Sequence, residues 1–384
     1  AQARLRPSVS GPMAASLPAS LAVVWLSAMS TALADRVAPI DRAGWMGAHS
    51  GALSGRTLLD ITLPGSHNSG NYAGGLSSEH ICASDYRYGD YRRAAAAAGV
   101  APLSQSRFDE RMIPWNVNHF SPIAEQLRRD GARFFHLKIC NFGPPGAKTM
   151  DLADVRFQHR GYTTRETVAA TLEDMKAFLL DNPKELLVLG FNNLHSAAPG
   201  GFGDADALAL AEALASALGE AALVRREELR TSTLGELIGV GRRFVVFLGG
   251  SSRLAGRLPP GILLSSENLV EDWDGVMASG NLDGSSTWLV RNVHMRATTR
   301  DRFYVMQANP NNAEDLMFKA MISGEGPQSN EAFLASFLHG LPALVTSAIS
   351  RAPGARVNAV STDFLNVSKP FDIAMRLMGL EVYV

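Results

Sequence analysis

The sequence is short of several features that would indicate a function class at once. Its 384 residues contain two cysteines, Cys82 and Cys140, which excludes a disulfide-rich scaffold and a cysteine-based structural zinc site. The two cysteines can form one bridge if the chain is exported, or remain two buried thiols, and both alternatives stay open. The nine histidines show no H-E-x-x-H or comparable spacing, so a zinc enzyme is not indicated.

An excess of charge of one sign is also lacking. Lysine and arginine together number 36, aspartate and glutamate 37, and the formal net charge is −1. Without a basic excess we expect neither nucleic acid as a partner nor stable adsorption to an anionic membrane. Hydrophobic residues make up 46% of the chain, which is ordinary for a globular protein that buries a large core in one or two domains.

Long hydrophobic runs are few. The apolar stretch at 21–29, "LAVVWLSAM", is too short to span a bilayer, and "ALA" at 32–34 fits the small-residue rule for signal cleavage. We therefore interpret residues 1–34 as a signal or targeting segment and 35–384 as one folded domain. The expected location is outside the cell or in the secretory-pathway lumen. The C-terminal "MRLMGLEVYV" has no long apolar tail, so a stable membrane anchor is not expected.

What is present is a succession of short apolar and β-branched runs typical of strands. The eight runs are 58–63, 132–140, 155–159, 185–191, 243–249, 261–266, 303–308 and 357–365. Helical patterns separate several of them, at 163–183, 204–219, 330–351 and 369–378. This order predicts an α/β fold, an irregular (β/α)8 TIM-type barrel. The alternative is an open doubly wound sheet, but the glycine-rich phosphate fingerprint after its first strand is missing.

Polar residues stand at the ends of these runs, where a barrel carries its active site. His67 follows the first run in "LPGSHNSG", Lys138 lies near the end of the second, and His159 ends the third. Asn192 follows the fourth, and Asp363 lies near the end of the eighth. Because a closed barrel places its last strand beside its first, we expect Asp363 and His67 to be neighbours.

Three segments carry a family resemblance. "LPGSHNSG", "IAEQLRRDGARFFHLKI" and "FQHRGYTTRETVAATLEDMKAFLLDNPKELLVLGFNN" resemble, in order and spacing, the X-domain of the phosphatidylinositol-specific phospholipase C superfamily. The likeness is to the bacterial, X-domain-only and GPI-specific members. It covers residues 57–193 and returns at "VNAVSTDFLNVSKPFDIAMRLM", which is similar to the last strand and helix of that barrel.

The resemblance implies cleavage of an inositol phosphodiester in phosphatidylinositol or a GPI-type lipid at a membrane surface. The inositol 2-hydroxyl attacks phosphorus, and diacylglycerol and inositol 1,2-cyclic phosphate result. It implies His67 as general base, His159 as general acid and Asp363 as the carboxylate that fixes the tautomer of His67. Lys138 stands where calcium-independent members place an arginine. A histidine pair suits this chemistry, because one imidazole must be neutral and the other charged near neutral pH.

The same resemblance places Asn68, Asn192 and Glu267 in the substrate-binding pocket. No metal site and no cofactor are expected, and calcium in particular is not, because an ammonium at Lys138 and a divalent cation exclude each other. His136 stands where the family usually has an acidic residue, and Lys138 lacks the bidentate fork of arginine.

Two other functions remain open. The altered second strand favours a catalytically impaired barrel that binds an inositol- or sugar-phosphate headgroup. A TIM-barrel glycosidase needs two facing carboxylates at strand ends, and Asp363 is the one credible candidate.

Overall fold

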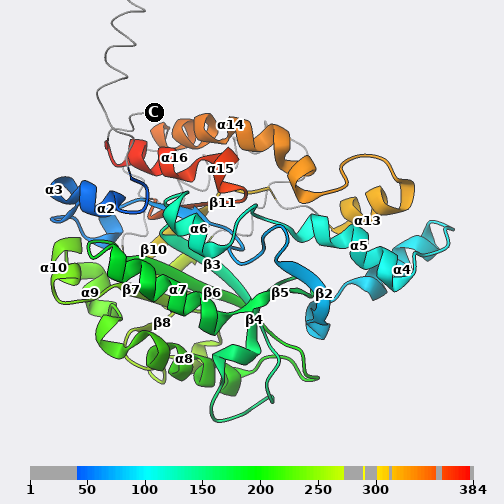
Figure 1. The fold of residues 1–384 in the computed structure, drawn as a ribbon, viewed down its shortest axis with the longest axis horizontal. Coiled ribbons are helices and arrows are strands. Elements are labelled where there is room, and N and C mark those ends of the chain that lie inside the picture. The colour runs from blue at the N-terminus through cyan, green and yellow to red at the C-terminus, as the bar shows by residue number, and fades with distance from the viewer. Residues whose placement is uncertain (1–40, 272–288, 290–300, 311–313, 352–356, 381–384) are drawn as a thin grey trace, which may run out of the picture. The chain divides into compact units, whose positions relative to one another are not determined.

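The computed structural model describes residues 41–271, 289, 301–310, 314–351 and 357–380, all within one compact unit, Asp41–Val382 (Figure 1). The predicted segment 1–34 lies outside the described residues. At the centre of the described part, eight parallel strands run in the order β8-β7-β6-β3-β1-β11-β10-β9. Their bounds are β1 Leu63–Ser66, β3 Phe134–Asn141, β6 Leu187–Ser196, β7 Phe244–Leu248, β8 Ile262–Leu264, β9 Leu269–Glu271, β10 Phe303–Gln307 and β11 Ala359–Thr362.

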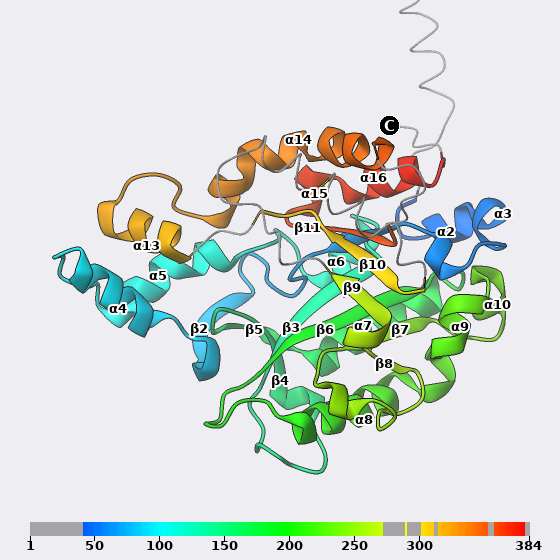
Figure 2. The same ribbon diagram turned by 180° about the vertical axis from the view of Figure 1, so that it is seen from behind.

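This arrangement is the predicted irregular barrel. Strand β1 pairs in parallel with both β11 and β3, so the last parallel strand of the chain lies beside the first. Among the described residues no ladder joins β8 to β9, which interrupts the ring at that point. Seen from behind, β9, β10 and β11 lie side by side, and α14 and α16 cover β11 (Figure 2).

Three further strands form an antiparallel extension of the sheet: β2 (Leu76–Ile81), β5 (Tyr162–Thr167) and β4 (Val155–His159). β4 pairs with β3, β5 pairs with β4, and β2 pairs with β5 at the outer edge. β1 pairs with the first two residues of β3, whereas β4 pairs with its last three, at Ile139, Cys140 and Asn141. The β4–β5 hairpin therefore adjoins β3 beyond the end of β1. The prediction of 155–159 as a barrel strand is wrong in direction, because this run pairs antiparallel.

Three further details differ from the sequence predictions. Residues 58–60 form a 3-10 turn, η1 (Leu58–Asp60), in which the Thr57 hydroxyl donates to Asp60 Oδ2 at 2.8 Å, so the strand begins only at Leu63. The eighth parallel strand is β9, a three-residue strand that the sequence analysis did not predict. Residues 163–167 belong to β5, so the following helix begins after Thr167, whose hydroxyl accepts from Ala170 N.

Helices cover the parallel strands. Those on the β3, β6 and β7 side are α6 (Ile123–Arg128), α7 (Val168–Asp181) and α8 (Asp204–Leu218), and those on the β11 side are α14 (Asn330–Ser350), α15 (Leu365–Ser368) and α16 (Pro370–Leu377). Helices α4 (Tyr88–Ala97), α5 (Gln105–Asn116) and α13 (Glu314–Ser323) gather beside β2 and β5 around a buried aromatic cluster. The remaining helices are α2 (Trp45–Ala48), α3 (Ser50–Leu53), α9 (Arg226–Thr231), α10 (Leu234–Gly239) and α11 (Ser265–Asn268), and the remaining 3-10 turns are η2 (Ala83–Asp85), η3 (Leu152–Asp154), η4 (Glu220–Ala222) and η5 (Ser252–Leu254).

Helix α14 is long and apolar enough to cross a membrane by length and composition alone. Its apolar side chains, among them Leu334, Phe337 and Leu341, are buried in a cluster with Tyr304 of β10 and Val360 of β11. One face of α14 therefore packs on the sheet.

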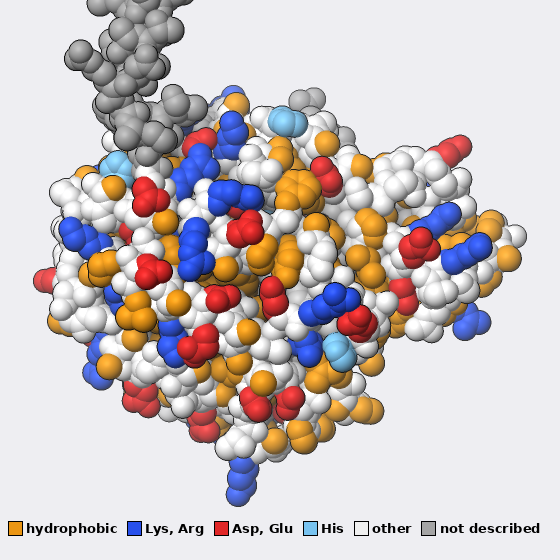
Figure 3. All heavy atoms as spheres, in the orientation of Figure 1, with side chains coloured by type: hydrophobic (Ala, Val, Ile, Leu, Met, Phe, Trp, Pro, Cys, Tyr) orange, Lys and Arg blue, Asp and Glu red, His pale blue; other side chains and the backbone are white. Residues whose placement is uncertain are grey.

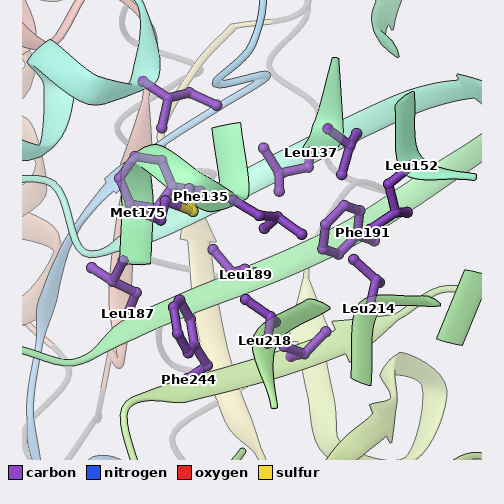
Figure 4. Packing of buried hydrophobic residues seen from close by; sticks show 14 of the residues in the cluster. Phe135, Leu137, Leu152, Met175, Leu187, Leu189, Phe191, Leu214, Leu218 and Phe244 are labelled. Carbon is purple, nitrogen blue, oxygen red and sulfur yellow. The ribbon is translucent and has the colours of Figure 1, made fainter. Parts of the chain in front are cut away.

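The alternation of side chains along β3 separates the core from the site. Phe135, Leu137 and Ile139 pack outward into the cluster formed with α7 and α8 (Figure 4). Because successive side chains of a strand point to opposite faces, Phe134, His136 and Lys138 point inward. Phe134 closes the lower interior against Phe303 of β10, with ring centroids 6.2 Å apart. Above it, the interior becomes polar.

Candidate active site

His67 and Asp363 meet at the carboxyl ends of β1 and β11. The register of these strands pairs Ser66 with Thr362, so the next residue of each chain segment emerges at the same height. His67 Nδ1 lies 2.7 Å from Asp363 Oδ1, although 296 positions separate the two residues. The expected contact is therefore present, and both side chains are buried.

Two asparagines hold the Asp363 carboxylate from its other sides. Asn118 Nδ2 donates to Oδ1 at 3.0 Å, and Asn330 Nδ2 donates to Oδ2 at 3.4 Å. Burial raises the pKa of Asp363 to about 6, against the opposing effects of His119, the two amides and Lys138. The carboxylate is thus fixed in orientation and is ionised above that pH.

Burial also sets the protonation state of His67. Its pKa lies well below the usual value of histidine, because burial and then the positive charges of Lys138 and Arg160 disfavour the imidazolium. In the neutral ring, Nδ1–H donates to Asp363 and Nε2 carries the lone pair. This is the tautomer that a general base requires.

His136 stacks on the imidazole of His67. The ring centroids are 5.2 Å apart, with 14° between the planes. His136 Nδ1 accepts from the backbone N–H of Asn68 at 3.3 Å, and burial lowers the pKa of His136 well below its usual value. His136 and Lys138 therefore share the inward face of β3, and the second strand brings both to the site.

His159 ends β4 and not a parallel strand, yet it reaches the same group of residues. Its Nδ1 lies 3.5 Å from the carbonyl oxygen of Asn116. Burial lowers the pKa of His159 well below the usual value, and Lys138, Arg160 and His67 add to the effect. His67 and Lys138 thus act electrostatically on His159, and its pairing with His67 as acid and base stays a prediction.

Lys138 is the inward cation of β3. Burial and then Arg160 lower its pKa to about 8, while Asp85, Asp363 and Glu271 act in the opposite direction. Within the described part of the chain, Lys138 makes no hydrogen bond or ion pair. Burial therefore disfavours the charged ammonium, and the field of these acids opposes that effect.

The predicted substrate-binding residues divide into two groups. Asn68 has a left-handed backbone, φ 48°, and within the described residues neither polar atom of its buried side chain has a hydrogen-bond partner. Asn192 Nδ2 donates to Glu271 Oε2 at 2.6 Å, and Gln307 Nε2 donates to the other oxygen of that carboxylate at 3.1 Å. Glu271 and Gln307 are the last residues of β9 and β10, and Asn192 lies within β6.

Glu267 is not part of this arrangement. It lies on α11, is half-exposed and forms an ion pair with Arg226 at 3.1 Å. The carboxylate that this region directs to Asn192 and Lys138 is Glu271, four positions later. Glu267 thus pairs with Arg226, and Glu271 is the carboxylate that contacts Asn192.

Sequence reasoning also missed Arg160, Asn118 and Asn330. A signal for the turn that carries Arg160 is present in "HRGY", because a residue followed by glycine between two strands is compatible with a two-residue hairpin turn. The asparagines come from loops and helix starts whose contacts no periodicity reveals. No group of three or more His, Cys, Asp or Glu within the described residues is arranged to hold a metal ion, and the expectation of a calcium-independent site stays a prediction.

No protein-family model matches the sequence, and no curated protein matches it. Solved structures do. A phosphatidylinositol-specific phospholipase C of S. aureus superposes with a TM-score of 0.55 and 16% identity, over 87% of this chain and 97% of the other. That of Listeria monocytogenes gives a TM-score of 0.54 and 12% identity, over 87% and 98%. The chain has the fold of these phospholipases, and at such identities the likeness shows the fold alone.

Proposed function

We propose that this protein is a phosphodiesterase of the phospholipase C type that cleaves phosphatidylinositol or a GPI-type lipid. The inositol 2-hydroxyl gives its proton to His67 Nε2 as its oxygen forms a bond to phosphorus. The bond from phosphorus to the diacylglycerol oxygen then breaks, and that oxygen takes a proton from His159. The products are inositol 1,2-cyclic phosphate and diacylglycerol.

The observation that carries the proposal is the contact between His67 and Asp363. His67 and Lys138 also act electrostatically on His159. Asp363 holds the proton on Nδ1 of His67 and stabilises the imidazolium that forms, as an aspartate does beside a catalytic histidine. Each positioned acid or base contributes about 10²–10⁴-fold to such a proton transfer.

His159 must carry a proton when the leaving oxygen departs. In the protein without substrate, burial, Lys138 and Arg160 keep its pKa low. A phosphodiester monoanion bound beside these cations offsets their charge, so substrate binding raises the pKa of His159 and favours its protonated form. Lys138 then faces the negative charge that develops on the phosphoryl oxygens.

The headgroup is expected to lie toward Asn192, Glu271 and Gln307, whose amide and carboxylate groups are joined by hydrogen bonds. Such groups recognise hydroxyls by paired donation and acceptance. On the face shown in Figure 3, acidic and basic side chains are interspersed, without a large field of one sign.

We further propose that the protein is exported. Cys82 and Cys140 form a disulfide, the alternative that the sequence tied to export. Disulfides persist in oxidising compartments and are rare in the cytosol, which supports secretion or residence in the secretory lumen.

The test is diacylglycerol release from phosphatidylinositol vesicles by the purified protein, measured in EDTA and again with added calcium. We expect the same rate in both. Activity that disappears in EDTA and returns with calcium would contradict the role of Lys138 in place of the metal. Headgroup binding without any release would leave the barrel as a binding protein.

A further inference from the structure

His119 is a buried histidine that the proposed chemistry does not use. It lies in the connection between α5 and α6 and is 1% exposed. Its Nε2 lies 2.7 Å from the carbonyl oxygen of His67 and 3.0 Å from Ser66 Oγ, although 52 positions separate His119 from His67. The contact therefore joins this connection to the turn that carries the candidate base.

The neighbours of His119 decide which of its nitrogens carries the proton. Burial lowers the pKa of His119 to about 4, so the ring is neutral at neutral pH and has a single N–H. The His67 carbonyl only accepts, and the Ser66 hydroxyl donates its hydrogen to Gln126 Oε1 at 2.6 Å. Gln126 is oriented for this by its Nε2, which donates to the Ser69 carbonyl at 2.9 Å. The proton of His119 is therefore on Nε2, which donates to the His67 carbonyl and to Ser66 Oγ.

This hydrogen bond holds one of the two peptide groups that flank the Cα of His67. On the other side, His67 N donates to the Thr362 carbonyl at 3.0 Å. Because peptide groups are planar, holding both of them sets the direction in which the imidazole leaves the backbone. The next residue, Asn68, has φ 48°, a left-handed conformation that persists only where its surroundings hold it. His119 supplies one of the contacts that hold this turn.

The residue before His119 holds the carboxylate partner of the candidate base. Asn118 Nδ2 donates to Asp363 Oδ1 at 3.0 Å, and the Asn118 carbonyl accepts from Phe364 N at 2.7 Å. The backbone N–H groups of Asn118 and His119 both donate to the Asn71 carbonyl, at 2.8 and 3.1 Å, which anchors the two residues. Two consecutive residues thus hold the base by its backbone and the acid by its side chain.

We propose that His119 is a positioning residue for the candidate base: its Nε2–H, donated to the His67 carbonyl, keeps the imidazole of His67 in register with Asp363. Because His119 acts through His67, its loss should slow the chemical step more than it weakens binding of the headgroup. In its effect on turnover this inference rests on the proposed function. The alignment of His67 is measurable without substrate.

The experiment compares wild type with H119Q, H119L and, as control, N358L. Glutamine carries an N–H donor for the His67 carbonyl at a similar reach, whereas leucine has none. Asn358 is also buried, and its Nδ2 donates to the carbonyls of Leu58 and Ile61 at 3.3 and 3.4 Å, at the amino end of β11. N358L therefore removes buried hydrogen bonds at the end of the strand away from the site.

Two quantities are measured for each protein, together with its thermal unfolding midpoint. Turnover of phosphatidylinositol vesicles gives kcat and KM. NMR of protein labelled with ¹⁵N-histidine, without substrate, gives the Nδ1–H signal of His67, identified by its absence from His67→Ala.

We expect H119L to lower kcat about 10–100-fold with little change in KM, since misplacement of a catalytic group by about 1 Å can cost about 10²-fold. The Nδ1–H signal of His67 should move in H119L. H119Q should restore both quantities toward wild type. N358L should unfold at a lower temperature and leave both quantities unchanged.

Wild-type kcat and an unmoved His67 signal in H119L would contradict the positioning role, as would an H119Q variant no better than H119L. If H119L does not fold, H119Q decides: wild-type values support the role, and a lost signal contradicts it. A fall of kcat in N358L as large as in H119L would reduce the effect to stability and contradict the role as well. A wild type without turnover would refute the proposed function, and the His67 signal alone would then decide the positioning role.

Discussion

Asp363 is the residue on which the chemistry of His67 depends. Its carboxylate accepts from His67 Nδ1 and from the amides of Asn118 and Asn330. In Asp363→Asn the amide favours the wrong tautomer of His67, with the proton on the nitrogen that must accept one. We expect turnover of phosphatidylinositol to fall about 10²–10⁴-fold.

The thermal unfolding midpoint of Asp363→Asn should change little, because the side chain keeps its volume and a buried charge is removed. Turnover and calorimetry on the same preparation check both parts. A variant with turnover within a few-fold of wild type would show that Asp363 is structural only.

The charged forms of Asp363 and Lys138 set the predicted pH dependence. The pKa of Asp363 is raised to about 6, so the His67–Asp363 pair gains a proton and loses its base function as the pH falls below that value. The pKa of Lys138 is lowered to about 8, so its positive charge is lost as the pH rises above that value. The profile of kcat/KM should be bell-shaped between these limits.

Lys138→Arg isolates the alkaline limb. Because arginine stays protonated throughout the accessible range, we expect the fall in kcat/KM above pH 8 to disappear or move to higher pH, with the acidic limb unchanged. Rates measured from pH 5 to 10 test this. An alkaline limb at the same pH in the variant would assign that limb to a group other than Lys138.

Single residues also show what the sequence can and cannot reveal. His67, His159, Asp363 and Lys138 stand at the ends of apolar runs, and a motif with fixed spacing surrounds them. Arg160 lies in a turn, and no hydrophobic pattern encodes its left-handed backbone. Glu267 and Glu271 are four positions apart in one short connection, and only three-dimensional packing decides which carboxylate faces Asn192.

At the scale of elements, the β4–β5 hairpin was found as an apolar run but not as a hairpin. A run at 155–159 reveals that a strand forms, and it does not reveal which strand it pairs with or in which direction. Likewise β9 has three residues, too few for an alternating pattern to stand out. Long runs with helical or strand periodicity, such as those of α7 and β6, were found as elements, with ends two to five residues from the predicted ones.

The Cys82–Cys140 disulfide joins two of these elements. Cys82 precedes η2 and donates its N–H to the turn that carries Arg160, and Cys140 lies on β3 two residues after Lys138. The bridge closes a separation of 58 residues. Removing such a bridge costs about 2–4 kcal/mol, largely through the unfolded state.

We therefore expect the double variant Cys82→Ser/Cys140→Ser to unfold at lower denaturant concentration and to lose part of its turnover, because the β4–β5 turn loses a neighbour. Dithiothreitol should lower the stability and turnover of wild type in the same direction. The matched control is the double variant itself, on which the reductant should have no effect. Equal stability and turnover of wild type and variant would show that the disulfide contributes neither to folding stability nor to the activity of the site.

At the scale of the whole molecule, the parallel ring explains why distant segments share one site. All eight parallel strands end on the same side, so residues from β1, β3, β6, β9, β10 and β11 meet there. The opposite ends are used for stability: Arg133, which precedes β3, is fully buried and pairs with Glu185, which precedes β6, at 2.7 Å. The order of the apolar runs predicted the fold class and the side of the barrel that carries the site. It did not predict the interruption of the ring between β8 and β9, because that depends on which strands pair.

The central claim is that His67 and His159 act as one acid–base pair on an inositol phosphodiester. The most direct measurement is ³¹P NMR of phosphatidylinositol turnover by wild type, His67→Ala, His159→Ala and the double variant. The account predicts inositol 1,2-cyclic phosphate from wild type, loss of most activity in each single variant, and a double variant little slower than either, since groups that act as a unit are not additive. Near-normal formation of the cyclic phosphate by either single variant would contradict it.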